Sequence, residues 1–298
     1  MEAEFKRLVY RAVGPKPLPK PRKADTQTLI YPFSADWAWV AAHYLRTPSR
    51  VFWRLAELSA RRLEPLHDQV FDVLARLPTD WIGQAATMSV QVRRVGDFPA
   101  GPLQIRGAVK SAIMAAAAHR GHSLKLEPDA PDRLFIVEVR EDDIWLSLDL
   151  VGRSLHQRGY RRARGEAPLR ENVAAQLLML ARWDPRREAL VDPMAGSGTI
   201  AIEGVAMAQG HALWCDNFTP LCMSLPDFAS LRDRDYPALF GDARPPVVAN
   251  EINSDTLHAL HANAERARVQ DHIQVFHGDF RDLHPDRVMQ AAAGAECG

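Results

Sequence analysis

Residues 190–199 read LVDPMAGSGT, and this stretch decides the fold. A short apolar segment, EALVD at 188–192, runs into two closely spaced glycines, Gly196 and Gly198, and the apolar segment TIAIEGVAMAQG follows at 199–210. The letters GSGTIA fit G-x-G-x-x-A, in which glycines permit a tight strand-to-helix turn and a close approach of the backbone to a ligand. Alone, this pattern also fits a turn that serves only packing. A Walker loop is excluded, because no Gly-Lys-Ser/Thr follows.

The segments around this loop alternate between helix and strand patterns. ENVAAQLLMLARW (171–183) and DTLHALHANAERAR (255–268, with Ser254 as its N-cap) are predicted helices, whereas PPVVANEIN (245–253) and HIQVFHGDF (272–280) are predicted strands. Strand and helix in alternation predict parallel pairing with right-handed crossovers. Residues 188–298 are therefore expected to form the first three strands of a Rossmann-like α/β fold.

Carboxylates at the ends of the predicted strands favour one cofactor over another. Glu251 ends the second strand, where a carboxylate can accept hydrogen bonds from both ribose hydroxyls. Asp279 follows the third strand, where it can meet an adenine amino group. Asp192 precedes the glycines and would repel a pyrophosphate, but not a cationic cofactor without phosphate. The sequence thus favours S-adenosylmethionine over NAD, for which an acidic residue about 20 positions after the glycines is also missing.

The region before residue 150 mixes both kinds of pattern. Helical spacing of apolar residues occurs over 51–63 and 66–76, and an alanine-rich helix is expected over 108–120. Residues 88–93, 134–140 and 144–150 alternate like strands. We therefore predict a compact α+β domain here.

The first 25 residues carry seven basic residues, and PKPLPKPRK at 15–23 cannot form a helix or a central strand. They predict a flexible basic arm, which is either a solvated tail or an anion-binding segment.

The composition excludes several protein classes. The formal net charge is zero over 298 residues, so a nucleic-acid surface would require local clustering of charge. Three cysteines are too few for a disulfide framework, and Cys215 and Cys222 have poor spacing for zinc, so no metal is expected. No apolar run is long enough to cross a bilayer, and no signal-peptide core stands at the N-terminus. A cytoplasmic protein without a membrane partner is the expectation.

A basic cluster precedes the predicted Rossmann-like segment, and Glu166 is its only local acidic residue. We predict RNA-phosphate contacts for it, with Tyr160 available for stacking on a base. A solvated linker between domains is the alternative. The cluster consists of Arg153, Arg158, Arg161, Arg162, Arg164 and Arg170.

The segments LHQRGYRRARGEAPLRENVAAQLL (155–178) and DPMAGSGTIAIEG (192–204) resemble the bacterial 23S rRNA guanine-N2 methyltransferases that carry a THUMP domain. The resemblance covers roughly residues 35–290. It implies an S-adenosylmethionine-dependent enzyme that methylates an exocyclic guanine amine of large-subunit rRNA. It also implies roles for single residues: Asp192, Pro193, Gly196 and Gly198 would line the methionine and ribose part of the cofactor, Glu251 would hold the ribose, Ile252 would pack on the adenine, Asp279 would bind the adenine edge, and Lys110 would bind RNA.

The resemblance further implies an α+β N-terminal RNA-binding region followed by an incomplete α/β Rossmann-like methyltransferase fold. Its parts would be a basic Pro-rich arm (1–34), a partial ferredoxin-like plus THUMP domain (35–152), a basic linker and helix (153–187), and the N-terminal half of the methyltransferase domain (188–298).

The sequence departs from the family at several points. Ala195 stands where the family has cysteine, and Ser111 follows Lys110 where the family has aspartate. The family's Asn-Pro-Pro-Tyr/Phe motif, which holds the target amine, does not occur in these 298 residues. We therefore expect this chain alone to be inactive and leave its catalytic residues unassigned. The alternative is a non-catalytic RNA-binding protein with a vestigial cofactor fold.

Overall fold

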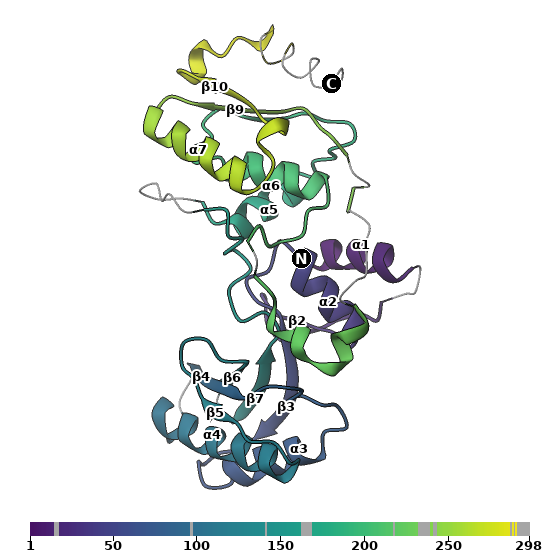
Figure 1. The fold of residues 1–298 in the computed structure, drawn as a ribbon, viewed down its shortest axis with the longest axis vertical. Helices are drawn as coiled ribbons and strands as arrows, with labels where there is room; N and C mark the ends of the chain where they lie inside the picture. The colour runs from purple at the N-terminus through teal and green to yellow at the C-terminus, as the bar shows by residue number, and fades with distance from the viewer. Residues whose placement is uncertain are drawn as a thin grey trace.

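The computed structural model shows an elongated molecule with one sheet and its helices towards each end of the long axis (Figure 1). The N-terminal helices lie between these two bodies. The structure describes residues 1–14, 18–95, 98–140, 142–161, 169–216, 218–231, 239–240, 243–286, 288 and 290.

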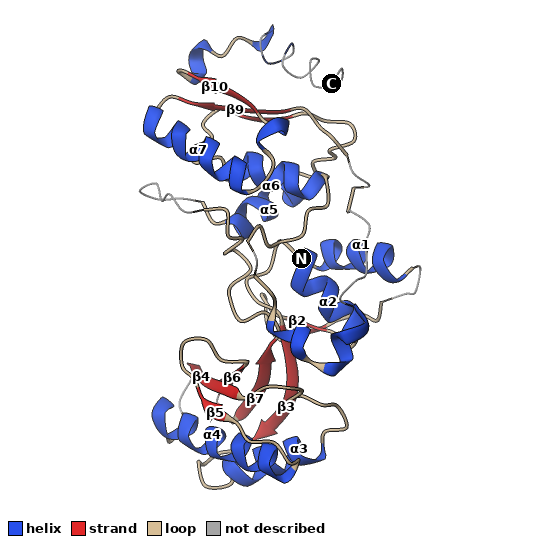
Figure 2. Ribbon diagram, in the orientation of Figure 1, coloured by secondary structure: helices blue, strands red, loops and turns tan. Residues whose placement is uncertain are grey.

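The first body is a five-stranded sheet with two helices on one face (Figure 2). The strand order is β3-β7-β6-β4-β5; β4 pairs in parallel with β5 and β6, and the other pairs are antiparallel. Apolar side chains of both helices are fully buried against the sheet, including Val70, Leu74 and Ile113. The elements are β3 (Phe52–Ser59), α3 (Leu66–Arg76), β4 (Thr87–Val95), α4 (Pro102–His119), β5 (Lys125–Leu126), β6 (Arg133–Arg140) and β7 (Asp143–Asp149).

Most of the patterns in this body are confirmed. The three predicted strands become β4, β6 and β7, and the two predicted helices at 66–76 and 108–120 become α3 and the longer α4. The helix predicted over 51–63 is wrong, because residues 52–59 form strand β3. Its pairing with β7 shifts register between Arg54 and Ala56, so Leu55 and Ala56 are both buried and the alternation expected of a strand is broken.

The flexible arm predicted for the first 25 residues is also wrong for its first half. Residues Glu2–Val13 form helix α1, which buries Phe5, Leu8 and Val9 at helical spacing against α2 (Ala35–Tyr44). Downstream, β1 (Arg22–Lys23) and β2 (Leu29–Ile30) form a small antiparallel pair. Three residues of the proline-rich stretch, 15–17, lie outside the described residues.

The second body is a three-stranded parallel sheet of order β10-β9-β8. The predicted alternation of parallel strands and helices is thereby confirmed, with the first strand on one edge. Helices α6 and α7 contact the sheet, and α5 packs on α6 (Figure 1). The bounds are α5 (Glu171–Leu180), β8 (Leu190–Asp192), α6 (Thr199–Ala208), β9 (Val247–Glu251), α7 (Ser254–Arg266) and β10 (Gln274–His277), with 3₁₀ turns η1 (Leu221–Ser224), η2 (Pro226–Leu231), η3 (Gln270–His272) and η4 (Phe280–Asp282).

The segment between α6 and β9 crosses back to the first body. The Nη1 atom of the fully buried Arg133, on β6, donates to Ser224 Oγ at 2.6 Å, and η2 contacts α2. Leu178 of α5 and Met207 of α6 also belong to the same apolar cluster as α1–α4. The two sheets are therefore joined by packing as well as by chain connections.

Candidate cofactor-binding site

The glycine loop connects the end of β8 to the first residue of α6. Gly196 (φ +56°) and Gly198 (φ +84°) both have left-handed backbones, which glycine adopts without the strain of a side chain. A Cβ atom on Gly198 would lie 2.8 Å from Leu260 Cγ on α7, whereas one on Gly196 would meet nothing within 4 Å. Gly198 therefore serves close helix packing, and Gly196 leaves open space at the sheet edge.

Glu251 lies beside this loop, as the sequence predicts. It ends β9, and its Oε2 accepts a hydrogen bond of 2.9 Å from the backbone N–H of Gly196. Its Oε1 accepts one of 2.8 Å from the N–H of Asn253. An ionised carboxylate offers about four lone-pair sites, so two stay available for neighbouring hydroxyl donors. This geometry suits the two hydroxyls of a ribose.

Asp192 adds a second carboxylate to the same edge. The side chain is largely buried, and this burial, together with the charge of Glu251, raises the pKa of Asp192 against a weak backbone hydrogen bond from Met194. A cationic ligand group would offset the repulsion between the two carboxylates, while a phosphate would increase it.

Asp279 lies at the end of the third strand but is already engaged. Its Oδ1 accepts a hydrogen bond of 2.9 Å from the N–H of Arg281, and the Arg281 guanidinium forms an ion pair with the carboxylate. These Arg281 bonds hold the pKa of Asp279 at about 2. Contact with an adenine amino group would therefore require this guanidinium to share the carboxylate.

Each loop that follows a strand of this sheet exposes an apolar side chain. Met194, Ile252 and Phe280 are 69%, 63% and 49% exposed. His277 Nε2 donates to the carbonyl of Ile252 at 3.0 Å and fixes that loop. Exposed apolar groups beside carboxylates suit a ligand with an aromatic base and a ribose. Only Ile252 was predicted for this role.

Two buried asparagines hold the loops in place, and sequence reasoning missed both. Asn250 Nδ2 donates to the carbonyls of Pro193 (3.1 Å) and Gly278 (3.0 Å), so it joins the loops after β8 and β10 across β9. Asn263 Nδ2 donates to the carbonyl of Ser197 at 3.2 Å from α7. The only sequence signal for Asn250 is a polar residue inside the apolar run VVANE.

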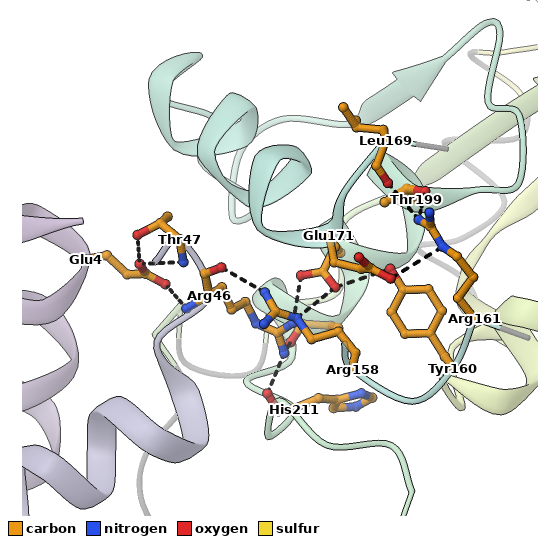
Figure 3. A network of polar contacts seen from close by, with 12 residues as sticks. Glu4, Arg46, Thr47, Arg158, Tyr160, Arg161, Leu169, Glu171, Thr199 and His211 are labelled. Atoms are coloured by element: carbon orange, nitrogen blue, oxygen red, sulfur yellow. Dashed lines mark hydrogen bonds and ion pairs between the residues drawn. The ribbon is translucent and has the colours of Figure 1, made fainter. Parts of the chain in front are cut away.

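Arg158 and Tyr160 occupy the interior, so the RNA contacts predicted for them are wrong. Each is 1% exposed and contacts the fully buried Glu203 of α6. Figure 3 shows both side chains within one network of polar contacts. Arg158 Nε lies 3.4 Å from Glu203 Oε1, and Tyr160 Oη donates to the same oxygen at 3.4 Å. Arg46 Nη1 contacts the other Glu203 oxygen at 3.0 Å. Side chains buried in this way cannot reach a phosphate or stack on a base.

Arg161 also has an internal role in place of the predicted RNA contact. Its Nη2 donates to Thr199 Oγ1 (2.6 Å) and to the carbonyl of Leu169 (2.8 Å), and its Nε pairs with Glu171 at 3.4 Å (Figure 3). Arg161 thus fixes the start of α6, directly after the glycine loop. Of the other predicted RNA-binding residues, Lys110 is half-exposed on α4, and Arg162 and Arg164 lie outside the described residues.

Metal ligation and membrane insertion each require a recognisable arrangement of side chains. In the described part of the chain, no three His, Cys, Asp or Glu side chains come together as metal ligands. None of its helices has both the length and the apolar character needed to span a bilayer.

Comparison with protein families places the match on the second body. Residues 158–292 match the family model described as UPF0020: RMKL-like, methyltransferase domain. The ribosomal RNA large subunit methyltransferase K/L of Stutzerimonas stutzeri is 35% identical over 202 residues, which cover 62% of this chain and 27% of the relative. That of Ectopseudomonas mendocina is 31% identical over 261 residues, which cover 80% of this chain and 34% of the relative. The chain therefore spans about a third of the length of these relatives.

Solved structures show the same fold over most of the chain. A structure described as SMU.472, a putative methyltransferase complexed with SAH, superposes with a TM-score of 0.67 at 23% identity, covering 85% of this chain and 67% of that one. A structure described as a predicted N6-adenine-specific DNA methylase from Listeria monocytogenes gives a TM-score of 0.72 at 23% identity, covering 89% and 70%. The methyltransferase-like fold predicted from the sequence agrees with these superpositions.

Proposed function

We propose that this protein acts in the S-adenosylmethionine-dependent methylation of an exocyclic guanine amine of large-subunit rRNA. The observation that carries the cofactor assignment is Glu251, whose carboxylate lies 2.9 Å from the glycine-loop amide of Gly196 and keeps acceptor capacity for two hydroxyls. The match of residues 158–292 to a methyltransferase domain supports the same assignment.

The remaining groups of the site fit the other parts of this cofactor. Glu251 binds the ribose, and Ile252 with Met194 packs on the faces of the adenine. Asp192 and Pro193 line the methionine part, where the carboxylate offsets a positive charge. The cofactor, when bound, supplies an activated methyl group on a sulfonium. Because the lone pair of an aromatic amine is delocalised, transfer to it depends on positioning of the amine.

RNA recognition is assigned to the first body. The relatives act on large-subunit rRNA by name, and the segment 35–152 resembles a THUMP region. In this proposal α4 presents Lys110 to RNA, residues 153–187 connect the two bodies, and residues 188–298 bind the cofactor.

The cofactor assignment is tested by Glu251→Gln. This change keeps an acceptor for Gly196 but removes the charge, and hydrogen bonds to charged groups contribute roughly 1.5–3 kcal/mol each. We expect the affinity for S-adenosylhomocysteine, measured by isothermal titration calorimetry, to fall about 10-fold or more. Glu265→Gln, an exposed carboxylate on α7, is the matched control and should bind as the wild type does.

An unchanged affinity in Glu251→Gln would contradict the ribose role. A wild-type chain that binds rRNA but neither S-adenosylmethionine nor S-adenosylhomocysteine would instead support the non-catalytic RNA-binding alternative.

A further inference from the structure

Three chain segments meet beside the buried Arg46 and Arg158. They bring Arg50, His156 and Arg170 together. The N–H of Leu155 donates to the carbonyl of Ser49 at 2.9 Å, which places His156 beside Arg50. Asn172 Nδ2 donates to Ser49 Oγ at 3.3 Å, which brings the first turn of α5, with Arg170 before it, to the same point.

The side chains of this set remain available to a ligand. Arg170 is exposed, and its guanidinium forms no hydrogen bond or ion pair with the described part of the chain. His156 is partly exposed. Arg50 keeps 22% of its side chain exposed while Nη1 pairs with the buried Asp149 at 2.6 Å. The neighbouring Gln157 is exposed as well.

The surroundings carry an excess of positive charge. Arg46 and Arg158 share the single carboxylate of Glu203, while Arg161 pairs with Glu171 and Arg50 with Asp149. Arg170 adds a fifth guanidinium group to the four that pair with these three carboxylates. Burial lowers the pKa of His156, and the charges of Arg170, Arg158, Arg50 and Arg161 lower it further. The imidazole thus lies within a positive field and offers an N–H donor to an anion.

The set lies close to the glycine loop. Arg170 directly precedes Glu171, Glu171 pairs with Arg161, and Arg161 donates to Thr199 at the start of α6. A ligand bound by Arg170 is therefore two side-chain contacts from the candidate cofactor site.

We propose that Arg50, His156 and Arg170 bind a backbone phosphate of the RNA substrate next to the cofactor site. This inference rests on the proposed function. A phosphodiester carries one negative charge and several acceptor oxygens, which match two guanidinium groups and one imidazole N–H donor. In this proposal these three residues contact the RNA in place of Arg158 and Arg161, whose guanidinium groups pair with Glu203 and Glu171.

The test is the salt dependence of binding to a radiolabelled transcript of bacterial large-subunit rRNA, measured by filter binding from about 50 to about 200 mM KCl. Each phosphate contact contributes roughly 0.7–0.9 to the slope of log affinity against log salt, depending on whether the nucleic acid is single- or double-stranded. Arg170→Gln should reduce the slope by about this amount, whereas Arg170→Lys should preserve it. His156→Ala should weaken binding, because it removes the imidazole N–H donor from the site.

Arg187→Gln, an exposed arginine beyond the other end of α5, is the control with the same change of charge and should leave both quantities unchanged. Equal slopes for the wild type and Arg170→Gln, or an equal loss in Arg187→Gln, would overturn the site while leaving the cofactor assignment intact. The RNA site is also overturned if Arg170→Gln weakens binding of inorganic phosphate alone and not of RNA. A wild-type chain that does not bind the transcript contradicts the proposed rRNA function as well.

Discussion

Gly198 and Glu251 show how single residues build the candidate site, and how differently the sequence reveals them. Both could be predicted, because a glycine loop and a carboxylate at the end of the next parallel strand meet at one sheet edge. The RNA contact predicted for Arg158 is wrong, because its side chain pairs with a residue far away in the sequence. Its partner Glu203 is 45 residues away, and local charge counting cannot reveal a buried ion pair between distant segments.

At this scale we expect alanine substitutions of the two loop glycines to change the stability of the protein by different amounts. Gly198→Ala adds a strained left-handed alanine, which costs about 1–2 kcal/mol, and a Cβ at 2.8 Å from Leu260. Gly196→Ala adds the same kind of backbone strain without a close contact. Urea unfolding should show Gly198→Ala as the more destabilised of the two. Gly107→Ala, in the interior of α4 with free space around the new methyl, should be more stable than the wild type by roughly 0.5–1 kcal/mol. Equal stabilities of the two loop variants would contradict the packing role of Gly198.

Helices and strands were predictable where their period was regular. The strands that alternate, β4, β6 and β7, and the parallel set β8, β9 and β10 lie where the pattern places them. Strand β3 was not predictable because a bulge buries Leu55 and Ala56 in succession, which imitates the apolar spacing of a helix. For α1 the helical spacing of Phe5, Leu8 and Val9 is present in the sequence, but the proline-rich stretch that follows is typical of a flexible arm.

The start of α7 gives a test at the scale of an element. Ser254 was the predicted N-cap, but the structure assigns the cap to Asn253, whose Oδ1 accepts a hydrogen bond of 2.9 Å from the N–H of Thr256. Asn253→Ala should therefore destabilise the protein by about 1 kcal/mol in urea unfolding. Ser254→Ala is the neighbouring control and should change stability far less. If Ser254→Ala destabilised the protein more than Asn253→Ala, Ser254 would be the N-cap, as the sequence predicts.

Across the whole molecule, a buried polar cluster connects the two bodies. Glu4 of α1 accepts hydrogen bonds from Arg46 N (2.7 Å) and Thr47 Oγ1 (2.6 Å), and Arg46 continues to Glu203 on α6 (Figure 3). Burial alone would raise the pKa of Glu203, but Arg158 and Arg46 outweigh it, so the pKa is lowered. The cluster therefore fixes α1 and the segment before β3 against α6, the helix that follows the glycine loop.

Removing the central charge should weaken this connection. Glu203→Gln leaves Arg46 and Arg158 buried without a counter-charge, which is expected to cost roughly 3–5 kcal/mol in urea unfolding at pH 7. Because the folded pKa is lowered, the charged Glu203 contributes its full stability above the ordinary value of 4.5 and loses it as the pH falls through the lowered pKa. The difference between wild type and variant should therefore shrink in acid. A difference that stays constant across this range would contradict the charge-based account.

The central claim is that the edge formed by Asp192, Gly196 and Glu251 binds a nucleoside cofactor without phosphate. Isothermal titration calorimetry of the full chain with S-adenosylhomocysteine and with NAD, under identical conditions, tests it most directly. The account predicts binding of S-adenosylhomocysteine at least about 10-fold tighter than of NAD, because each 1.4 kcal/mol of carboxylate–pyrophosphate repulsion is about tenfold in affinity. Equal or tighter binding of NAD would contradict it.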